Sequence, residues 1–173
     1  DFSSYIALLD TGVVQYHDHD GEEEALSVFQ HQNIPAKFYG FEFQGNINLP
    51  SNFTLSYWGD YVRAKNKEGG NLPRIPPLTL GSSLSYQWNA LQTNIDIFHK
   101  FSQNDIGTNE LKTDNYTNVA LNMNYQLPYA KALNLFIKGD NLLDEERRDH
   151  TSFLKDKTLM GERSFSVGMT GSF

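Results

Sequence analysis

The final strand-like segment of the chain constrains the fold more than any other feature. From Arg163 onward, apolar and small polar residues alternate with a period of two. One phase holds Phe165, Val167, Met169 and Phe173, and the other holds Ser164, Ser166, Thr170 and Ser172. This period is typical of a strand with one apolar and one polar face. An edge strand in a soluble sheet usually carries charge or proline that prevents edge pairing, and residues 164–173 carry neither.

The same alternation recurs along the rest of the chain. We expect eight antiparallel strands, near residues 2–10, 36–49, 53–64, 78–90, 91–103, 115–127, 132–143 and 162–173. Most of them reach the roughly 9–11 residues that a tilted strand needs to cross a bilayer. The first, Phe2 to Leu9, is the least regular, because both of its phases are fairly apolar.

The connections between these segments alternate in length. Short turns are expected at Pro50-Ser51, at Asn89-Ala90 and at residues 128–131, and long polar loops at 10–35, 64–77, 102–114 and 144–162. Outer-membrane barrels have short periplasmic turns and long extracellular loops, whereas compact soluble domains seldom have loops of this length. The predicted fold class is therefore all-β: an antiparallel up-and-down transmembrane β-barrel of about eight strands, in the bacterial outer membrane, with both chain ends on the short-turn side.

Composition excludes several other classes. The mean hydropathy of −0.52 and the lack of an 18-residue apolar run exclude a transmembrane helix but not a barrel. A net charge of −7 argues against a nucleic-acid partner. Without cysteine there is no disulfide or thiolate site. His99 and Asp96 fall in opposite phases, so we find no nucleophile–base set and predict that the chain is not an enzyme.

The alternation also predicts which side chains face lipid. We expect an outward set of Phe41, Phe43, Leu55, Leu121, Met123, Leu135, Ile137, Val167 and Met169, and an inward set that includes Ser83, Asn122, Asn124 and Ser166. The inward positions are mostly small, and they would fill the narrow lumen of an eight-stranded barrel loosely. The pattern therefore favours the wall of a larger barrel.

Two alternatives remain open at this point. The first is a self-contained eight-stranded barrel whose loops act as a surface adhesin or antigen, which pairing of Phe2–Leu9 with Phe165–Phe173 would support. The second is a soluble binder of the lipocalin kind, which requires a polar outer face and an apolar lumen.

Three motifs resemble those of TonB-dependent outer-membrane receptors. They are Asn-Leu-Pro-Arg-Ile-Pro-Pro at 71–77, Asp-Asn-Leu-Leu-Asp-Glu-Glu-Arg-Arg at 140–148, and Gly-Glu-Arg-Ser-Phe at 161–165, followed by the terminal Phe173. The family often has Pro-Gly-Arg before its last strand, whereas here Met160 replaces the proline and Glu162 is inserted. The resemblance covers essentially the whole chain and keeps the order of the motifs.

The resemblance implies that residues 1–173 form the C-terminal part of a barrel of about 22 strands. The plug domain and the segment that contacts TonB have no counterpart in these residues, so we expect TonB contact to belong to an N-terminal region outside them. The implied partners are outer-membrane lipid, lipopolysaccharide and the barrel assembly machinery, which would engage the strand that ends in Phe173. The implied activity is import of zinc or of another metal-bearing ligand.

The first long polar segment carries a candidate metal site. We expect its ligands among His17, Asp18, His19, Asp20, Glu22, Glu23 and Glu24, with help from His31 and, in the last loop, His150. Imidazole nitrogen and carboxylate oxygen suit zinc, and His-rich tracts are a compositional sign of metal binding. Residues 10–35 and 149–156 also resemble loops of the zinc-scavenging branch of the family. Zinc would be cargo, and no resident cofactor is expected.

Two other interpretations of this segment compete with zinc capture. An acidic run is usually a solvated loop. Calcium also suits the Asp/Gly/Glu pattern, although the EF-hand register is missing.

The last loop holds three arginines that suit lipopolysaccharide phosphates, Arg147, Arg148 and Arg163, because the guanidinium fork matches phosphate geometry. The alternative is a set of weak loop ion pairs with Glu145, Glu146 and Asp149.

Overall fold

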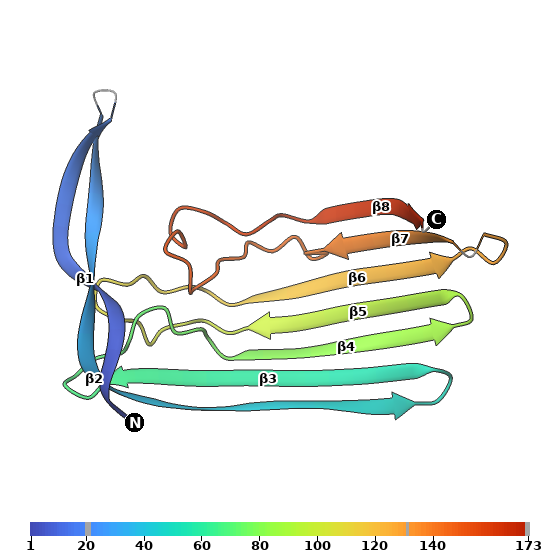
Figure 1. Cartoon of the computed structure of the whole chain (residues 1–173), viewed down its shortest axis with the longest axis horizontal. Coiled ribbons are helices and arrows are strands. Elements are labelled where there is room, and N and C mark those ends of the chain that lie inside the picture. The colour runs from blue at the N-terminus through green and yellow to red at the C-terminus, as the bar shows by residue number, and fades with distance from the viewer. Residues whose placement is uncertain (20–21, 131, 172–173) are drawn as a thin grey trace.

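The computed structural model describes residues 1–19, 22–130 and 132–171, and these form a single antiparallel sheet in chain order (Figure 1). Its strands are β1 (Phe2–His19), β2 (Glu22–Leu49), β3 (Phe53–Asn66), β4 (Thr79–Trp88), β5 (Leu91–Lys100), β6 (Tyr116–Gln126), β7 (Leu133–Asp140) and β8 (Ser164–Gly171). The predicted all-β class, strand number and antiparallel order are confirmed. The described residues include no helix long and apolar enough to cross a membrane.

The sheet has two parts, and β2 belongs to both. Its second half, from Ala36 to Leu49, pairs with β3 and begins a seven-stranded wall that continues to β8. Its first half pairs with β1, from the Phe2↔Ala36 pair to the His19↔Glu22 pair at the far end. The first half of β2 and all of β1 therefore form a long hairpin that rises away from the wall at the end where the long loops lie (Figure 1).

This hairpin corrects three predictions. Residues 10–35 are strand rather than loop, apart from residues 20 and 21, which lie outside the described residues. The strand expected at 2–10 pairs with residues 29–36 instead of spanning the wall, and among the described residues it forms no ladder with β8. The N-terminus also lies at the long-loop end of the wall, whereas β8 runs toward the short turns, so the two ends of the described chain are not on the same side (Figure 1).

The change of partner along β2 occurs at Pro35. A proline has no N–H to donate, so within a sheet it is confined to edges and irregular positions. Pro35 lies between Ile34, which pairs with Tyr5, and Ala36, which pairs with both Phe2 and Asn66. The β1–β2 register also shifts between Phe2 and Tyr5, so the ladder is interrupted at the point where β2 leaves the wall.

The register gathers the apolar phase of every wall strand on one face. Directly opposed residues share a face, and the apolar pairs run across the sheet as Ile47↔Leu55↔Leu84↔Ile95↔Leu121 and as Met123↔Ile137↔Val167. Many of these side chains are exposed, from 36% for Leu84 to 82% for Val167. A face of exposed aliphatic and aromatic side chains that crosses seven strands is far larger than the apolar patches of soluble monomers.

The opposite face is polar and lines a hollow. Its pairs include Ser56↔Ser83↔Asp96 and Asn94↔Asn122↔Lys138↔Ser166, and Asn94 Oδ1 accepts hydrogen bonds from Ser83 and Ser85 at 2.7 Å each. A hollow of about 1020 Å³ lies near the short turns, and Asn48, Thr54, Gln92, Asn94, Asn122 and Asn124 contribute to its lining. The predicted inward set therefore lies on the hollowed face, which is the reverse of a lipocalin-like binder.

The short turns use residues that tolerate a left-handed backbone. Ser51 (φ 60°) and Asn52 (φ 64°) connect β2 to β3, and Asn89 (φ 50°) connects β4 to β5. Positive φ at these positions matches the right-handed twist of the strands, and Asn accepts it more readily than most residues.

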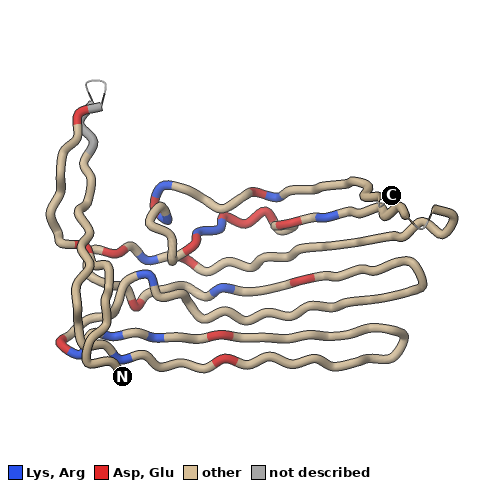
Figure 2. The backbone as a smooth tube through the Cα atoms, in the orientation of Figure 1, with Lys and Arg blue, Asp and Glu red and all other residues tan. Residues whose placement is uncertain are grey.

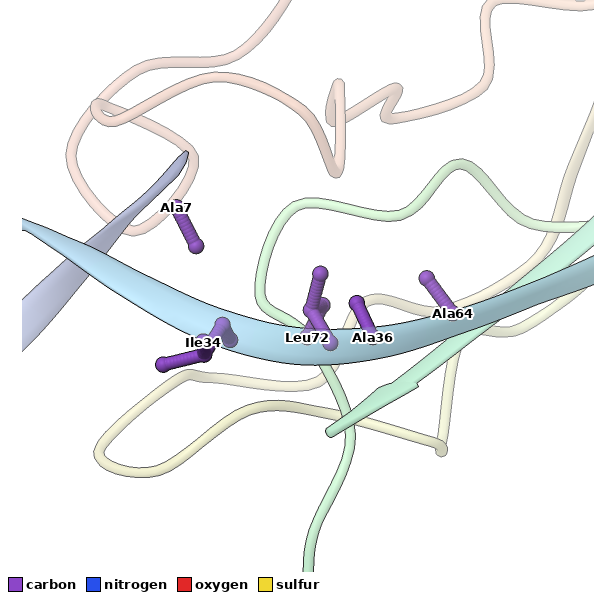
Figure 3. Close-up of a cluster of buried hydrophobic side chains, with 5 residues drawn as sticks. All are labelled: Ala7, Ile34, Ala36, Ala64 and Leu72. Atoms are coloured by element: carbon purple, nitrogen blue, oxygen red, sulfur yellow. The ribbon is translucent and has the colours of Figure 1, made fainter. Parts of the chain in front are cut away.

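A small apolar core fixes the base of the hairpin. Ala7, Ile34, Ala36, Ala64 and Leu72 are buried together, and they come from β1, β2, β3 and the loop after β3 (Figure 3). Ala36 is fully buried and Leu72 is 3% exposed. Leu72 thus anchors the β3–β4 loop against the junction of hairpin and wall.

Charge is concentrated at the long-loop end of the wall (Figure 2). The strand halves next to the short turns, such as 43–49, 82–88 and 121–126, contain no Lys, Arg, Asp or Glu. A charge-free band of strand bounded by a charged end is the layout of a membrane-spanning wall with an aqueous outer face.

Candidate functional site

The outer half of the hairpin carries the predicted metal ligands in a fixed register. His17 pairs with Glu24, Asp18 with Glu23, and His19 with Glu22. Residues alternate between the two faces of a ladder, so His17, His19, Glu22 and Glu24 share one face and Asp18 and Glu23 share the other. For residues 19 and 22–24 this placement concerns the backbone, and Asp20 lies outside the described residues.

The register separates His31 from this group. His31 pairs with Leu8, nine positions along β1 from His17, which corresponds to roughly 30 Å at the rise of a strand. His150 lies in the β7–β8 loop, where it is 2% exposed and engaged with other loops. Among the residues that the structure describes, no three His, Cys, Asp or Glu side chains form a group suited to a metal ion.

The buried surroundings of His150 centre on one carboxylate, Glu110 of the β5–β6 loop. Its Oε1 accepts hydrogen bonds from the Arg74 N–H at 2.7 Å and from Lys155 Nζ at 2.5 Å, and its Oε2 accepts one from the Gly107 N–H at 2.7 Å. His150 Nε2 lies 3.2 Å from the same Oε1. Glu110 therefore joins the β3–β4, β5–β6 and β7–β8 loops.

The partners of Glu110 are themselves held in place. His150 Nδ1 lies 3.0 Å from Thr113 Oγ1, and Lys155 Nζ also donates to the carbonyl of His150 at 3.1 Å. The side chains of Glu110, Lys155 and His150 are 6%, 9% and 1% exposed. Burial by itself would raise the pKa of Glu110, but the hydrogen bonds from His150, Lys155, Gly107 and Arg74 outweigh it and lower the pKa to about 2.

This lowered pKa predicts acid sensitivity of the joined loops. A carboxylate whose pKa falls on folding contributes stability above its unfolded value of 4.5, and that contribution is lost as pH falls toward about 2. The difference corresponds to about 3 kcal/mol at neutral pH. We expect hydrogen exchange at the Gly107 and Arg74 amides, corrected for intrinsic rates, to accelerate between pH 4.5 and pH 2.5.

The matched variants for this measurement are Glu110→Gln and Glu146→Gln. Glu110→Gln should flatten the pH dependence, because the titrating group is gone. Glu146 is an exposed carboxylate in the β7–β8 loop, so Glu146→Gln should leave the dependence unchanged. Acid acceleration that persists in Glu110→Gln would assign the effect to another group.

A second buried cation organises the motif at residues 140–148. Arg147 is 4% exposed, and its guanidinium donates to Asn118 Oδ1 at 2.7 Å, to the carbonyl of Gly161 at 2.6 Å and to Asp140 Oδ2 at 3.0 Å. Asn141 is fully buried and exchanges hydrogen bonds with the backbone of Glu145. The motif is thus a folded unit that fixes the β7–β8 loop to β6.

This unit corrects the predicted role of Arg147 and gives the partners of the other two arginines. Arg147 is buried in an ion pair with Asp140, so it is not available to lipopolysaccharide phosphates. Arg148 donates to the carbonyl of Lys155 at 2.7 Å, and Arg163 pairs with Asp144 at 3.2 Å on the surface. The alternative prediction, ion pairs with Glu145, Glu146 and Asp149, was also wrong about the partners. Arg147 pairs with Asp140, and Arg163 pairs with Asp144.

Sequence reasoning missed Glu110, Lys155 and Gln103. Gln103 is fully buried; its amide donates to the carbonyl of Ile75 at 2.8 Å, and its Oε1 accepts from Arg63 at 2.7 Å. Glu110 and Lys155 are 45 positions apart. No spacing rule relates residues on separate loops, so this buried network carried no signal in the sequence.

Comparison with known proteins connects this architecture to a family of receptors. A family model described as "TonB dependent receptor-like, beta-barrel" matches residues 1–142. Among solved structures, the copper transporter OprC is 21% identical, with a TM-score of 0.78 over 99% of this chain and 27% of that one. A variant of the ferric enterobactin receptor PfeA from Pseudomonas aeruginosa is 22% identical (TM-score 0.71, 99% and 27%). The siderophore receptor PirA from Acinetobacter baumannii is 18% identical (TM-score 0.66, 98% and 27%). The chain thus spans about a quarter of each of these proteins, and at these identities the likeness shows the fold alone.

Proposed function

This chain belongs to the TonB dependent receptor-like β-barrel family, and from that premise we propose that it forms part of the wall of an outer-membrane receptor that imports a metal ion or a metal-bearing ligand. Members of this family are outer-membrane proteins. The observation that carries the proposal is the two-faced wall from β2 to β8, apolar on one side and polar on the other. A self-contained adhesin barrel is not favoured, because Phe2–Leu9 pairs with β2 rather than with β8.

The geometry supports import rather than catalysis. The polar face bounds a hollow of about 1020 Å³, as expected for the inner wall of a water-filled or plugged barrel. The similar proteins named above are a copper transporter and two siderophore-type receptors, all concerned with metals by their names. We therefore propose a metal or metal complex as cargo, with zinc as the specific candidate.

The proposed capture element is the outer half of the β1–β2 hairpin. His17 and His19 lie two positions apart on one strand and face Glu24 and Glu22 on the other. The backbone register thus puts two histidine positions and two glutamate positions on one ladder face, and imidazole with carboxylate is a donor set that suits zinc. The register leaves Asp18 and Glu23 on the other face, where they add negative charge that attracts cations.

The test is zinc titration calorimetry on the intact protein that carries this chain. We expect His17→Ala/His19→Ala to weaken binding by more than the roughly 10–100-fold that loss of an outer-shell partner costs. Ligation requires neutral imidazole, so affinity should also fall between pH 7.5 and pH 5.5, as histidine titrates through roughly 6.5.

The matched control is His31→Ala, which removes a histidine from the same hairpin at a distant position. It should bind zinc like the parent protein. Equal zinc binding by His17→Ala/His19→Ala, or affinity that does not change between the two pH values, would reject zinc capture here and leave the hairpin as an acidic, solvated arm.

A further inference from the structure

A second hollow lies farther out along the hairpin than its apolar core, between the hairpin strands and the long loops. Its volume is about 390 Å³, near the lower end of the range for small-molecule sites. The lining comes from β1 and β2 on one side and from the loops after β3, β5 and β7 on the other. A hollow of this size admits a ligand of one or two rings.

Its walls are aromatic and exposed. Phe29 of β2 and Phe153 of the β7–β8 loop meet edge to face, with ring centroids 5.3 Å apart, and they are 40% and 53% exposed. Three more exposed apolar side chains from separate segments line the same hollow: Leu26, Leu111 and Leu154. Exposed apolar side chains that converge on one hollow from distant parts of a chain mark a binding surface.

One cation touches this aromatic pair. The Arg74 guanidinium lies 4.3 Å from the centre of the Phe153 ring and 6.0 Å from that of Phe29. It donates one hydrogen bond to the carbonyl of Leu8 at 2.6 Å, and among the described residues no other acceptor engages its remaining N–H groups. The side chain is therefore held in place while several donors remain available to a ligand.

The backbone of Arg74 is fixed as firmly as its side chain. Arg74 has a φ of 57°, which is costly for a residue other than glycine. Its N–H donates to the buried carboxylate of Glu110, which sets this conformation. The Arg74 donors are thus presented to the hollow at little further entropic cost when a ligand binds.

Besides Arg74, five other charged side chains line the hollow and bear on which ligand charge it favours. Glu110 and Lys155 neutralise each other at 2.5 Å in its floor, and Asp10 accepts a hydrogen bond from the Gly12 N–H. Lys157 and Asp156 carry opposite charges at neighbouring positions of the lining. Negative and positive side chains in the lining therefore balance, and Arg74 is the cation that lies against the aromatic walls.

We propose that this hollow binds a small aromatic carboxylate, with its ring against Phe29 and Phe153 and its carboxylate on Arg74. The ring would bury apolar surface on both phenyl groups, and the guanidinium fork matches a carboxylate. The site goes beyond metal capture and does not rest on it, because none of the proposed zinc ligands lines the hollow.

The experiment compares two indole probes that differ in charge. Indole-3-acetate carries a carboxylate, and tryptamine carries an ammonium on a similar scaffold. Calorimetry on the intact protein should show saturable binding of indole-3-acetate and none of tryptamine at the same concentrations. Phe153→Ala should weaken indole-3-acetate binding roughly tenfold, because it removes a wall of the site.

The control is Tyr129→Ala, which removes an exposed aromatic residue in the β6–β7 turn at the opposite end of the wall and should bind like the parent. Zinc titration of Phe153→Ala should match the parent, which separates this site from the hairpin ligands. The proposal would be overturned if the parent did not bind indole-3-acetate saturably, if tryptamine bound equally well, or if Phe153→Ala left the affinity unchanged.

Discussion

Glu110→Ala is expected to release the outer loops with a loss of about 3–5 kcal/mol of local stability, the cost of leaving a buried charge without its partner. The substitution removes the acceptor for Lys155 Nζ and for the Arg74 and Gly107 amides, and with it the carboxylate that lies 3.2 Å from His150 Nε2. Hydrogen exchange should accelerate throughout residues 101–115 and 141–163. The wall strands should keep their protection, because loops and core open as separate units.

A second variant separates the charge effect from simple loss of packing. Glu110→Ala/Lys155→Met removes both ions, so it should recover part of the protection that Glu110→Ala loses. Protection in Glu110→Ala that equals that of the parent would show that the loops hold together without this carboxylate.

Val167→Arg is expected to impair assembly of the barrel in the membrane. Val167 lies midway along β8, opposite Ile137 on the apolar face, and is 82% exposed. An arginine facing lipid at the bilayer midplane costs roughly 2–4 kcal/mol. The yield of heat-resistant, membrane-extracted barrel should fall accordingly when the intact protein is produced in cells.

The control for this variant is Thr170→Arg on the polar face. Thr170 pairs with Asn134, so the new cation meets no like charge, whereas an arginine at Ser166 would face Lys138. Thr170→Arg should assemble like the parent. Equal yields from Val167→Arg and Thr170→Arg would mean that the apolar face does not meet lipid.

The wall strands could be predicted because their environment imposes a period of two. Each wall strand has one apolar and one polar face, so the sequence between Phe38 and Leu49, or between Tyr116 and Gln126, alternates visibly. Predicted and observed strand limits therefore agree within a few residues from residue 36 onward. The prediction works because successive side chains of a strand point to opposite faces of the sheet. A strand that must have one apolar face therefore shows that face in its sequence.

The hairpin was missed because it stands outside that environment. Beyond the core at its base, most side chains of residues 12–18 and 25–33 are exposed, so residues 10–35 show no continuous apolar phase and resemble a polar loop. Two weaker signals were present. Val13, Val14 and Tyr16 favour strand, and Asp20-Gly21 is a dipeptide that favours a two-residue hairpin turn.

The two candidate sites also differ in whether the sequence alone could reveal them. The His/Asp-rich segment was visible as local composition, although its division between two ladder faces depends on register. The aromatic hollow was not visible, because Phe29, Arg74 and Phe153 come from three distant segments. Only the folded loops bring such residues together.

The position of β1 decides whether the wall has an odd or an even number of strands. Because β1 pairs with the hairpin half of β2, the wall runs from β2 to β8 and contains seven strands. In an antiparallel meander of seven, the first and last strands point the same way, and β2 and β8 both run from the long loops toward the short turns (Figure 1). A seam between them would be a parallel ladder. An all-antiparallel cylinder built on this wall therefore needs an odd number of further strands between β8 and β2. Residues 37–49 pair only with β3 within the described part of the chain, so their other backbone edge is where the first neighbour would pair.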